Sequence, residues 1–434
     1  MKAFLISLFC SFAFYANSQY YFPPLLGSEW NITPMSELGW CEDQLPPLIN
    51  YLEESDTKGF IVLKDGKIVI EHYFGTFTVD SLWYWASAGK SMTAFLVGLA
   101  QEDGFLDINQ STSEIIGDGW TNCTPEQEAA ITVLNQLTMT TGLDDTSGDV
   151  DCTDPECLNY LADPGTRWAY HNAPYTLLDS VLFYSTGQSI NSYLFNKLSL
   201  STGIYGAYLN TGYNNVLFSK TRMLARFGSL CLNDGTWNGT PIMTDQNYFY
   251  NMTHTSQDLN KAYGYLWWLN GSSDYMLPGF QLVLDGPLMP DAPMDVYAAM
   301  GKNGQIINVS PSENLVVVRV GNAPTNEIIF VPNVYNNTIW QYLNAVICTT
   351  SVDENSSNSP DLIVFPNPTC DAFCISDKTF SSTAKIRVID LTGRVVKSCS
   401  NTGQIDVSNL AIGQYHVQVE ENDRISETNL LIVR

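Results

Sequence analysis

The sequence predicts an α/β domain followed by a small β-sandwich. Apolar, β-branched runs occur at residues 60–74 and again at 295–322, and the long segment between them is mostly helical in pattern. Strands at both ends of a helical segment favour one sheet built from the two ends, with the helices inserted between them. Residues 350–361 are polar, and we expect them to form a linker. Short alternating runs resume after it at 362–434, which predicts the second, all-β unit.

The N-terminal residues predict an export signal. An apolar run at 3–15 is followed by Ala16 and Ser18, small residues that are typical of a signal-peptidase cleavage site. The run is too short to span a bilayer as a folded helix, and no later segment is apolar for the ~18 residues that a span needs. We therefore expect residues 1–18 to be removed and the mature chain to be exported, without a transmembrane span.

The chain is strongly acidic. Its 45 Asp and Glu residues outnumber its 20 Lys and Arg residues, which gives a formal net charge of −25. Nucleic acids and anionic membranes bind basic surfaces, so the charge argues against both as partners.

Cysteine usage is that of an exported protein. Of ten cysteines, one lies within residues 1–18, and the odd number that remains leaves at least one thiol outside any disulfide. Cys152 and Cys157 could close a small loop, although the sequence leaves the connectivity open. With four histidines and no Cys-x-x-Cys, we expect no zinc site, and we expect no other metal or cofactor.

The elements of the first domain follow from their patterns. Residues 60–74 place two apolar runs on either side of Lys64-Asp-Gly-Lys67, which predicts a β-hairpin. An apolar helical run follows Ser87 and stops at Gly104. Three later strands and a closing helix complete the domain, at residues 296–300, 305–309, 315–320 and 333–345.

Ser87 and Lys90 are candidates for a nucleophile and its base. Residues i and i+3 of a helix share a face, so Lys90 can reach the Ser87 hydroxyl. A hydroxyl becomes a good nucleophile when a neighbouring base takes its proton, and a lysine can do this when burial lowers its pKa. The same spacing recurs at Ser55–Lys58 and Ser382–Lys385 without an apolar helix after it, and Ser87 as a plain helix cap is the simple alternative.

Two further segments carry polar groups suited to acyl transfer. In Tyr170-His171-Asn172, the tyrosine could carry protons if nearby Lys⁺ charge lowers its pKa, and the asparagine could hold a substrate carbonyl. In Gly301-Lys302-Asn303-Gly304-Gln305, the lysine would add positive charge beside the serine. The backbone N–H after Gly304 would supply half of an oxyanion hole, with the Ser87 N–H as the other half. Taken alone, each segment also suits a core tyrosine or a hairpin turn.

In this order the three segments resemble the motifs of the β-lactamase and penicillin-binding family, most of all class C β-lactamases and their esterase and 6-aminohexanoate-dimer hydrolase relatives. The resemblance implies a β-lactamase/DD-peptidase-like fold over residues 19–349. In that fold an α/β domain, with an antiparallel sheet flanked by helices, and an all-helical domain enclose the site. Further segments carry the likeness, namely Leu137–Asp145, Asn172–Leu182, Ala225–Leu230, Gly264–Trp268 and Gly304–Pro311.

The resemblance also implies catalytic roles. Ser87 is the nucleophile, Lys90 is its base partner and Tyr170 shuttles protons. Whether Lys90 or Tyr170 is the principal base stays open.

The remaining site residues are implied in the same way. Asn172 binds the substrate, Lys302 is the lysine of the third motif, and Gln305, next to Gly304, gives the second oxyanion N–H.

Two departures from the family pattern bear on the reaction. His171 stands at a position that is usually small, and Asn303 replaces a hydroxyl residue that often helps to hold a β-lactam carboxylate. We therefore expect a secreted serine hydrolase that acts through an acyl-enzyme on esters, amides or D-peptides. The alternatives are a true β-lactamase or cell-wall D-Ala-D-Ala carboxypeptidase, and a catalytically silent surface-binding protein.

The tail has a resemblance of its own. Residues 362–434 resemble the C-terminal sorting domain of the type IX secretion system of Bacteroidetes, and an accessory β-sandwich is the alternative. The resemblance implies the type IX machinery as partner, export through the periplasm, and release or attachment at the cell surface. It rests on Phe365-Pro-Asn-Pro, Asp390-Leu-Thr-Gly-Arg and Leu410-Ala-Ile-Gly-Gln-Tyr.

Two clusters have simpler interpretations. The aromatic run at 263–268 suits a core better than an acyl pocket, and the acidic stretch at 144–156 suits a solvated face better than a calcium site.

Overall fold

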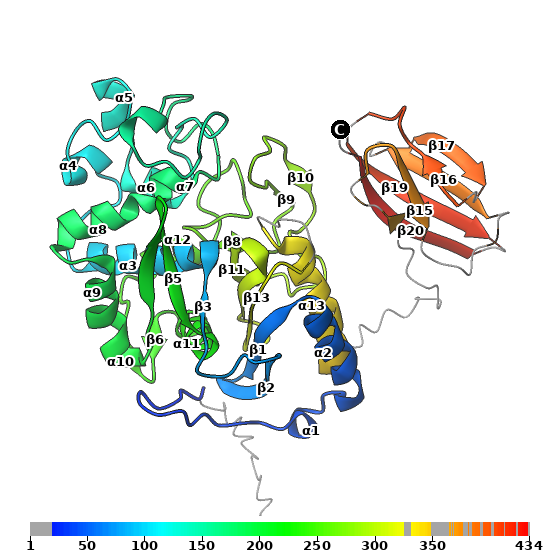
Figure 1. Ribbon diagram of the computed structural model, residues 1–434, viewed down its shortest axis with the longest axis horizontal. Coiled ribbons are helices and arrows are strands. Elements are labelled where there is room, and N and C mark those ends of the chain that lie inside the picture. The colour runs from blue at the N-terminus through cyan, green and yellow to red at the C-terminus, as the bar shows by residue number, and fades with distance from the viewer. Residues whose placement is uncertain are drawn as a thin grey trace, which may run out of the picture. The chain divides into compact units, whose positions relative to one another are not determined.

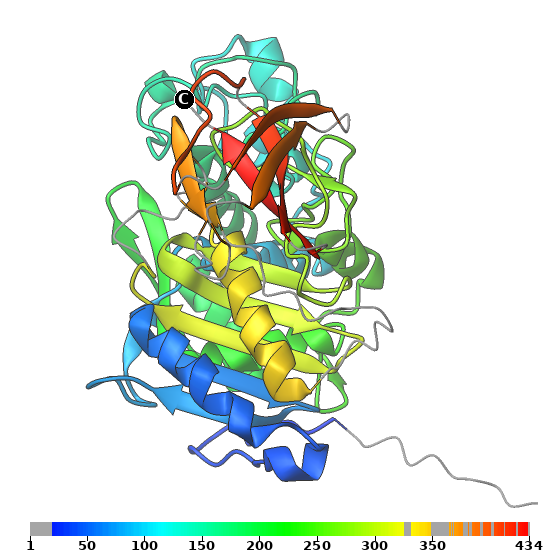
Figure 2. The ribbon, with the colours of Figure 1, turned by 90° about the vertical axis from the view of Figure 1, so that its right-hand side faces the viewer.

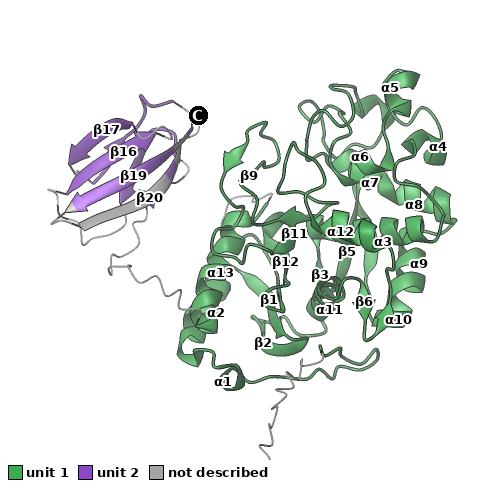
Figure 3. Cartoon of the chain, turned by 180° about the vertical axis from the view of Figure 1, so that it is seen from behind, with its two compact units in different colours: residues 1–349 green, residues 350–434 purple. Residues whose placement is uncertain are grey.

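The computed structural model describes residues 20–324, 331–348 and, with short gaps, 364–432. The chain divides into two units, residues 1–349 and 350–434, which Figure 3 shows in different colours. The expected signal peptide at 1–18 and the expected linker at 350–361 lie outside the described residues.

An antiparallel sheet with strand order β2-β1-β13-β12-β11-β8 forms the centre of the first unit (Figure 1). The expected hairpin turns at Asp65 and Gly66, whose φ values are 50° and 80°. Val62 of β1 lies opposite Val317 of β13, so the two ends of the unit do join in one sheet, as the sequence predicts. The strands are β1 (Thr57–Lys64), β2 (Lys67–Tyr73), β8 (Trp268–Leu269), β11 (Tyr297–Gly301), β12 (Gln305–Ser310) and β13 (Leu315–Gly321).

Helices cover both faces of this sheet. Neighbouring residues of β12 point to opposite faces. Ile307 therefore faces Gly228 of α11, while Asn308 exchanges two hydrogen bonds with Asn336 of α13, at 2.8 and 2.7 Å. Helices α2 and α13 pack together and cross one face, as Figure 2 shows. The helices around the sheet are α1 (Met35–Leu38), η1 (Glu42–Gln44), α2 (Leu45–Glu54), α11 (Thr221–Leu232) and α13 (Asn333–Ile347).

In the sequence, the helical region lies between strands β1 and β2 and the later strands of the sheet. It begins with a short turn and the apolar helix α3, whose residues from Gly89 to Ala100 are all buried. The helix ends at Glu102, and Gly104 follows with φ 76°. The helices are η2 (Ala86–Ala88), α3 (Gly89–Glu102), α4 (Thr112–Ile116), α5 (Pro125–Ala129), α6 (Val133–Leu137), η3 (Pro155–Cys157), α7 (Asn172–Thr176), α8 (Leu178–Thr186), α9 (Ile190–Leu194), η4 (Phe195–Ser199), α10 (Leu200–Thr202) and α12 (Gln246–Thr253).

Small sheets interrupt the helical region, and the sequence pattern does not predict them. One has the order β3-β5-β4 and brings residues on both sides of the Ser87 helix together. The others are two-stranded ladders. The strands are β3 (Leu82–Tyr84), β4 (Ala207–Thr211), β5 (Asn214–Lys220), β6 (Thr236–Trp237), β7 (Thr240–Pro241), β9 (Asp274–Tyr275) and β10 (Leu284–Asp285), and the turn η5 (Lys302–Gly304) joins β11 to β12.

The second unit is a β-sandwich, as predicted. Its sheets have the orders β14-β15-β18 and β17-β16-β19-β20. Phe373 and Ile405 of the first sheet share one core with Ile386, Val388 and Val417 of the second. The strands are β14 (Val364–Phe365), β15 (Ala372–Ile375), β16 (Lys385–Asp390), β17 (Val395–Ser400), β18 (Ile405–Asp406), β19 (Gly413–Glu421) and β20 (Arg424–Ile432).

Two disulfides form in the first unit. Cys41 and Cys348 are joined across 307 positions of sequence. Cys152 and Cys157 close the small loop that their spacing allows. Other cysteines are free thiols, among them the buried Cys231.

Candidate active site

Ser87 lies in the turn η2, immediately before helix α3. The buried Trp85 anchors this turn. Its Nε1 donates to Ser219 Oγ at 2.6 Å, and its backbone N–H donates to the Leu217 carbonyl at 2.8 Å. Ala86 has φ 47°, a left-handed conformation that is uncommon for a residue with a Cβ atom. The backbone just before Ser87 is therefore held in an unfavourable shape, as is frequent at functional sites.

Lys90 lies one helical turn after the serine and is only 3% exposed. Its Nζ is 3.6 Å from the ring centre of Tyr175 and 5.5 Å from that of Tyr170. Among the described residues, no carboxylate forms an ion pair with this amine. Burial lowers the pKa of Lys90 to about 7, although the charges of Asp151 and Asp179 oppose the shift. A large fraction of Lys90 is therefore a neutral amine near neutral pH, which can accept a proton.

Tyr170 brings a hydroxyl group to the same serine, because its side chain is hydrogen-bonded to Ser87. Its ring stacks on Trp268 at 5.7 Å between centres and meets Tyr263 edge-on at 6.2 Å. This burial raises the pKa of Tyr170, and the hydrogen bond to Ser87 offsets it only in part. The expectation that Lys⁺ charge lowers this pKa is wrong, because desolvation outweighs any attraction from Lys90. Tyr170 is a neutral phenol that can donate or relay a proton.

The aromatic run behind Tyr170 is core, as its composition suggests. Tyr263, Tyr265, Trp267 and Trp268 are all buried. Two of them, Tyr263 and Trp268, also form the wall on which Tyr170 rests. The aromatic run is therefore the part of the core that supports the Tyr170 ring.

Asn172 begins helix α7, two residues after Tyr170. Its Nδ2 donates to Asp151 Oδ1 at 2.7 Å, whereas its Oδ1 is buried without a hydrogen-bond partner. A carboxylate can only accept, so Asp151 determines which end of the Asn172 amide faces it. Asp151 was not among the expected site residues.

The third motif meets the backbone of the serine through Gly301. A Cβ atom at Gly301 would lie 2.5 Å from the Trp85 carbonyl oxygen and 3.0 Å from the Ser87 backbone nitrogen. A Cβ atom at Gly304 would instead meet Arg319, at 2.7 Å. The structure thus places Gly301 directly against the nucleophile's backbone.

Lys302 and Gln305 flank this contact. Lys302 is exposed and lies in the turn η5. Gln305 is fully buried and lies opposite Gly301 in the strand register. Its side chain bridges to Gly321, donating to the carbonyl at 2.7 Å and accepting from the N–H at 3.0 Å. The side chain of Gln305 therefore supports the turn, independently of any role of its backbone N–H.

A buried arginine fixes the same turn. Arg319 of β13 donates to the carbonyl oxygens of Asn303, at 2.7 Å, and Gly304, at 3.1 Å. It also donates to Thr57 Oγ1 and to the Ser55 carbonyl. Most of these acceptors are backbone carbonyl oxygens, so the guanidinium group of Arg319 holds the turn of the third motif in place. The sequence signal for it is a lone arginine within an apolar strand.

Asn303 also stabilises this turn. It has φ 65°, which asparagine tolerates better than most residues, and its Nδ2 donates to the Tyr84 hydroxyl at 2.9 Å. Its amide is therefore engaged within the protein.

His171, between Tyr170 and Asn172, is buried, and its Nδ1 has no hydrogen-bond partner. Burial lowers the pKa of His171 to about 4, so the ring is neutral near neutral pH. A neutral imidazole at this position adds bulk to the second motif without adding charge.

Within the part of the chain that the structure describes, no group of three or more His, Cys, Asp or Glu side chains could hold a metal ion. In the acidic stretch, Asp145 pairs with Arg167 at 2.6 Å, and Asp144 accepts from Thr146 and Ser147. The groups gathered around Ser87 are the amine of Lys90, the phenol of Tyr170 and backbone N–H groups.

Comparison with known proteins shows the family of this chain. The family model for Beta-lactamase matches residues 57–328, which is more than half of the chain. The chain belongs to the β-lactamase family. The fold expected from the motifs, an antiparallel sheet with flanking helices and a helical region, is the fold of this family.

Relatives within the β-lactamase family bear several names. The 6-aminohexanoate-dimer hydrolase of Paenarthrobacter ureafaciens is 23% identical over 343 residues, covering 67% of this chain and 79% of the relative. A solved penicillin-binding protein homologue from Caulobacter crescentus superposes with a TM-score of 0.52 at 14% identity, covering 70% of this chain and 98% of the homologue. A solved family VIII carboxylesterase gives 0.53 at 15% identity, covering 73% and 99%.

The tail matches a second family. Residues 363–434 match the Secretion system C-terminal sorting domain. A sorting domain of this kind indicates export to the cell surface or beyond by the type IX machinery. Among the described residues, no helix has both the length and the apolar character needed to cross a membrane.

Proposed function

We propose that this β-lactamase-family protein is a serine hydrolase that forms a covalent acyl-enzyme with carboxylic esters and amides. One observation carries the proposal. A buried lysine, whose pKa burial lowers to about 7, lies one helical turn from Ser87, and the side chain of Tyr170 is hydrogen-bonded to the same serine. These groups would serve as nucleophile, base and proton relay in the proposed reaction.

The proposed reaction has two halves. Ser87 Oγ attacks the substrate carbonyl, and its proton passes to the neutral amine of Lys90. The C–O or C–N bond then breaks, and the leaving group takes a proton through the Tyr170 hydroxyl. Water next attacks the acyl-Ser87 ester, which releases the acid and returns the proton to Ser87. The raised pKa of Tyr170 favours Lys90 as the base and Tyr170 as the relay.

Negative charge on the carbonyl oxygen needs N–H donors in this mechanism. The Ser87 N–H is one candidate. The contact of Gly301 with the Ser87 backbone supports the segment at Gly301 and Lys302 as the source of the second, in place of Gly304 and Gln305. Asn172 is proposed to hold the substrate carbonyl, and Lys302 to add positive charge.

We propose that the substrates are esters and unstrained amides in preference to β-lactams. Asn303 offers no hydroxyl for a β-lactam carboxylate, and its amide already donates to the Tyr84 hydroxyl. The carboxylesterase and the dimer hydrolase among the relatives support the same choice. For the tail, we propose passage through the periplasm before the outer membrane, then release or attachment at the surface.

Intact-mass spectrometry tests the acyl-enzyme. The purified protein is mixed briefly with p-nitrophenyl butyrate, a p-nitroanilide and a chromogenic cephalosporin, and is quenched in acid. We expect an added acyl mass on the wild type with the ester, and none on Ser87→Ala. Turnover of the ester should fall by at least about 1000-fold in that variant.

Ser91→Ala is the matched control. Ser91 lies in the same helix, is buried, and donates to the Leu266 carbonyl at 2.7 Å. It should keep both adduct and turnover. An adduct that persists in Ser87→Ala would contradict the proposal. If the cephalosporin is turned over faster than every ester, the protein is a β-lactamase instead.

A further inference from the structure

Asp151 lies beside the second motif but belongs to none of the three. Its Oδ1 accepts a hydrogen bond of 2.7 Å from Asn172 Nδ2. The NH₂ group of an amide carries two hydrogens. If Asp151 takes one of them, the other stays available for a substrate carbonyl, and the unpartnered Oδ1 of Asn172 points elsewhere.

The backbone around Asp151 is fixed on both sides. The Val150 carbonyl accepts from the Ala173 N–H, at the start of α7, at 3.0 Å. The Asp151 N–H donates to Asp149 Oδ1 at 3.0 Å, and the Cys152 N–H donates to the Asp149 carbonyl, also at 3.0 Å. The loop is therefore docked onto the helix that begins with Asn172.

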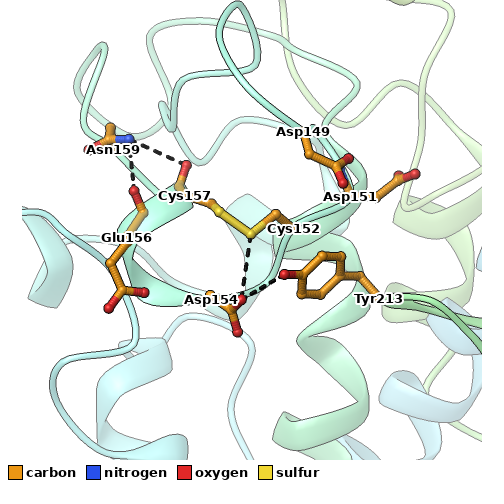
Figure 4. The surroundings of a disulfide bond; sticks show 8 residues. All are labelled: Asp149, Asp151, Cys152, Asp154, Glu156, Cys157, Asn159 and Tyr213. Carbon is orange, nitrogen blue, oxygen red and sulfur yellow. Dashed lines mark hydrogen bonds between the residues drawn. A yellow bond between two sulfur atoms is a disulfide. The ribbon is translucent and has the colours of Figure 1, made fainter.

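A covalent bond closes this loop directly after Asp151. Cys152 and Cys157 form a disulfide with 5.9 Å between their Cα atoms (Figure 4). On the other side of the disulfide, Asp154 accepts a hydrogen bond of 2.7 Å from Tyr213, whose ring reaches in from the turn between β4 and β5. Asp151 immediately precedes this closed loop, so the disulfide anchors the residue to which Asp151 is joined.

The charge of Asp151 also acts on Lys90. Two carboxylates raise the pKa of Lys90, Asp151 from this loop and Asp179 from α8, against the larger effect of burial. Asp179 accepts from Asn215 at 2.6 Å, and burial raises the pKa of Asp179 to about 6. The other titratable groups that face the amine are Tyr175 of α7 and Tyr170. Asp151 is the one carboxylate of these that also contacts Asn172.

We propose that Asp151 is a positioning residue of the Ser87 site, which orients the Asn172 amide and sets the charge around Lys90, and that the Cys152–Cys157 disulfide holds it there. This inference rests on the proposed function, because it assigns Asn172 to the substrate carbonyl and Lys90 to the base.

Two variants separate the two effects. Asp151→Asn removes the charge but keeps an oxygen that can accept from Asn172, whereas Asp151→Ala removes both. With p-nitrophenyl butyrate and the full chain, the acid limb of kcat/KM should move to lower pH in both variants, because loss of the negative charge lowers the pKa of Lys90 further. The rate at pH 6 relative to the plateau should rise roughly threefold. KM should rise roughly tenfold in Asp151→Ala alone.

The loop supplies matched variants. Cys152→Ala with Cys157→Ala should change KM and the acid limb in the same direction as Asp151→Ala, by less. Asp154→Asn, in the same loop, should change neither.

A second measurement does not need turnover. The titration of the Lys90 ¹³Cε resonance, assigned with Lys90→Arg, should show a lower midpoint in Asp151→Asn than in the wild type. Equal midpoints and equal KM values in all Asp151 variants would overturn the inference. If instead Ser87→Ala keeps full turnover while the Lys90 midpoint still moves, the proposed function fails and the charge effect of Asp151 stands.

Discussion

Gly301 lies so close to Ser87 that a Cβ atom on the glycine would be 3.0 Å from the serine's backbone nitrogen. Real Cβ atoms rarely approach a polar backbone atom so closely, and the Trp85 carbonyl oxygen would be nearer still, at 2.5 Å. Strand β11 and the nucleophile turn η2 are therefore packed backbone to backbone. The absence of a side chain at Gly301 lets the third motif reach the serine.

Gly301→Ala should consequently lose activity. The added methyl group must displace either β11 or η2, which moves the Ser87 N–H, and we expect kcat/KM to fall by at least about 100-fold. Stopped-flow acylation with p-nitrophenyl butyrate measures this. Gly228→Ala is the control, because its Cβ would collide with Val316 and not with the turn that carries Ser87. It should lower the melting temperature and leave kcat of the folded protein near that of the wild type.

Tyr170→Phe should separate the proton relay from the wall that supports it. The phenylalanine ring keeps the stacking on Trp268 but loses the hydrogen bond to Ser87, so kcat should fall by about 100-fold or more. Tyr248→Phe removes another buried tyrosine hydroxyl, which donates to the Ala94 carbonyl at 2.7 Å. It should cost roughly 1 kcal/mol of stability without changing kcat. Equal kcat values in the two variants would argue against a relay at Tyr170.

Lys90→Met should stabilise the protein while it abolishes turnover. Because burial lowers the pKa of Lys90 from its ordinary value of 10.5 to about 7, the unfolded chain binds more protons between these two values. Stability therefore rises with pH across this window, and the cost of the buried lysine is greatest below pH 7. The gain from Lys90→Met in urea unfolding should be roughly 2 kcal/mol at pH 6 and smaller at pH 10. A gain that grows with pH would contradict this sign.

Arg319→Met should loosen the third motif and destabilise the sheet. The variant removes the hydrogen bonds that Arg319 donates to the carbonyl oxygens of Asn303 and Gly304, at a cost of about 3 kcal/mol. Arg319→Lys can restore only part of the fork, so it should be intermediate in both stability and kcat. Lys220→Met, which breaks an exposed pair with Asp80 at 2.7 Å, should change stability by less than about 1 kcal/mol.

A chain that ends at residue 349 should keep the hydrolase activity and lose export. The apolar cores of the two units share no residue, so the first unit is expected to fold without the second. We expect the same kcat/KM as for the full chain in the purified protein, and retention inside the cell when it is expressed in a host with the type IX machinery. Loss of activity in the shortened chain would show that the tail contributes to the hydrolase.

Much of this fold could be read from the sequence because its signals are local. The hairpin at Asp65–Gly66, the later strands and helix α3 each follow from a short apolar period. The pairing of Ser87 with Lys90 needs only one turn of helix. The hairpin, the strands and the helix are confirmed in the structure, whereas the pairing of Ser87 with Lys90 stays a prediction.

The remainder depends on contacts between distant segments. The Asp151–Asn172 hydrogen bond joins residues 21 positions apart. In the sequence, Asp151 is one of several acidic residues in the same stretch, and nothing distinguishes it from the others. Gly301 and Gly304 look equivalent until the strand register places Gly301 on Ser87. The raised pKa of Tyr170 depends on Tyr263 and Trp268, which the chain brings up from nearly a hundred positions away.

The bond between Cys41 and Cys348 makes the hydrolase unit a covalent ring. It joins residues 307 positions apart, and Ser87, Lys90, Tyr170 and the third motif all lie between them. A protease that cuts after Cys348 detaches the sorting domain and leaves the ring closed. A protease that nicks one exposed loop inside the ring linearises it without freeing either fragment. Outside the cell, where disulfides persist, such a nicked enzyme remains one covalent molecule.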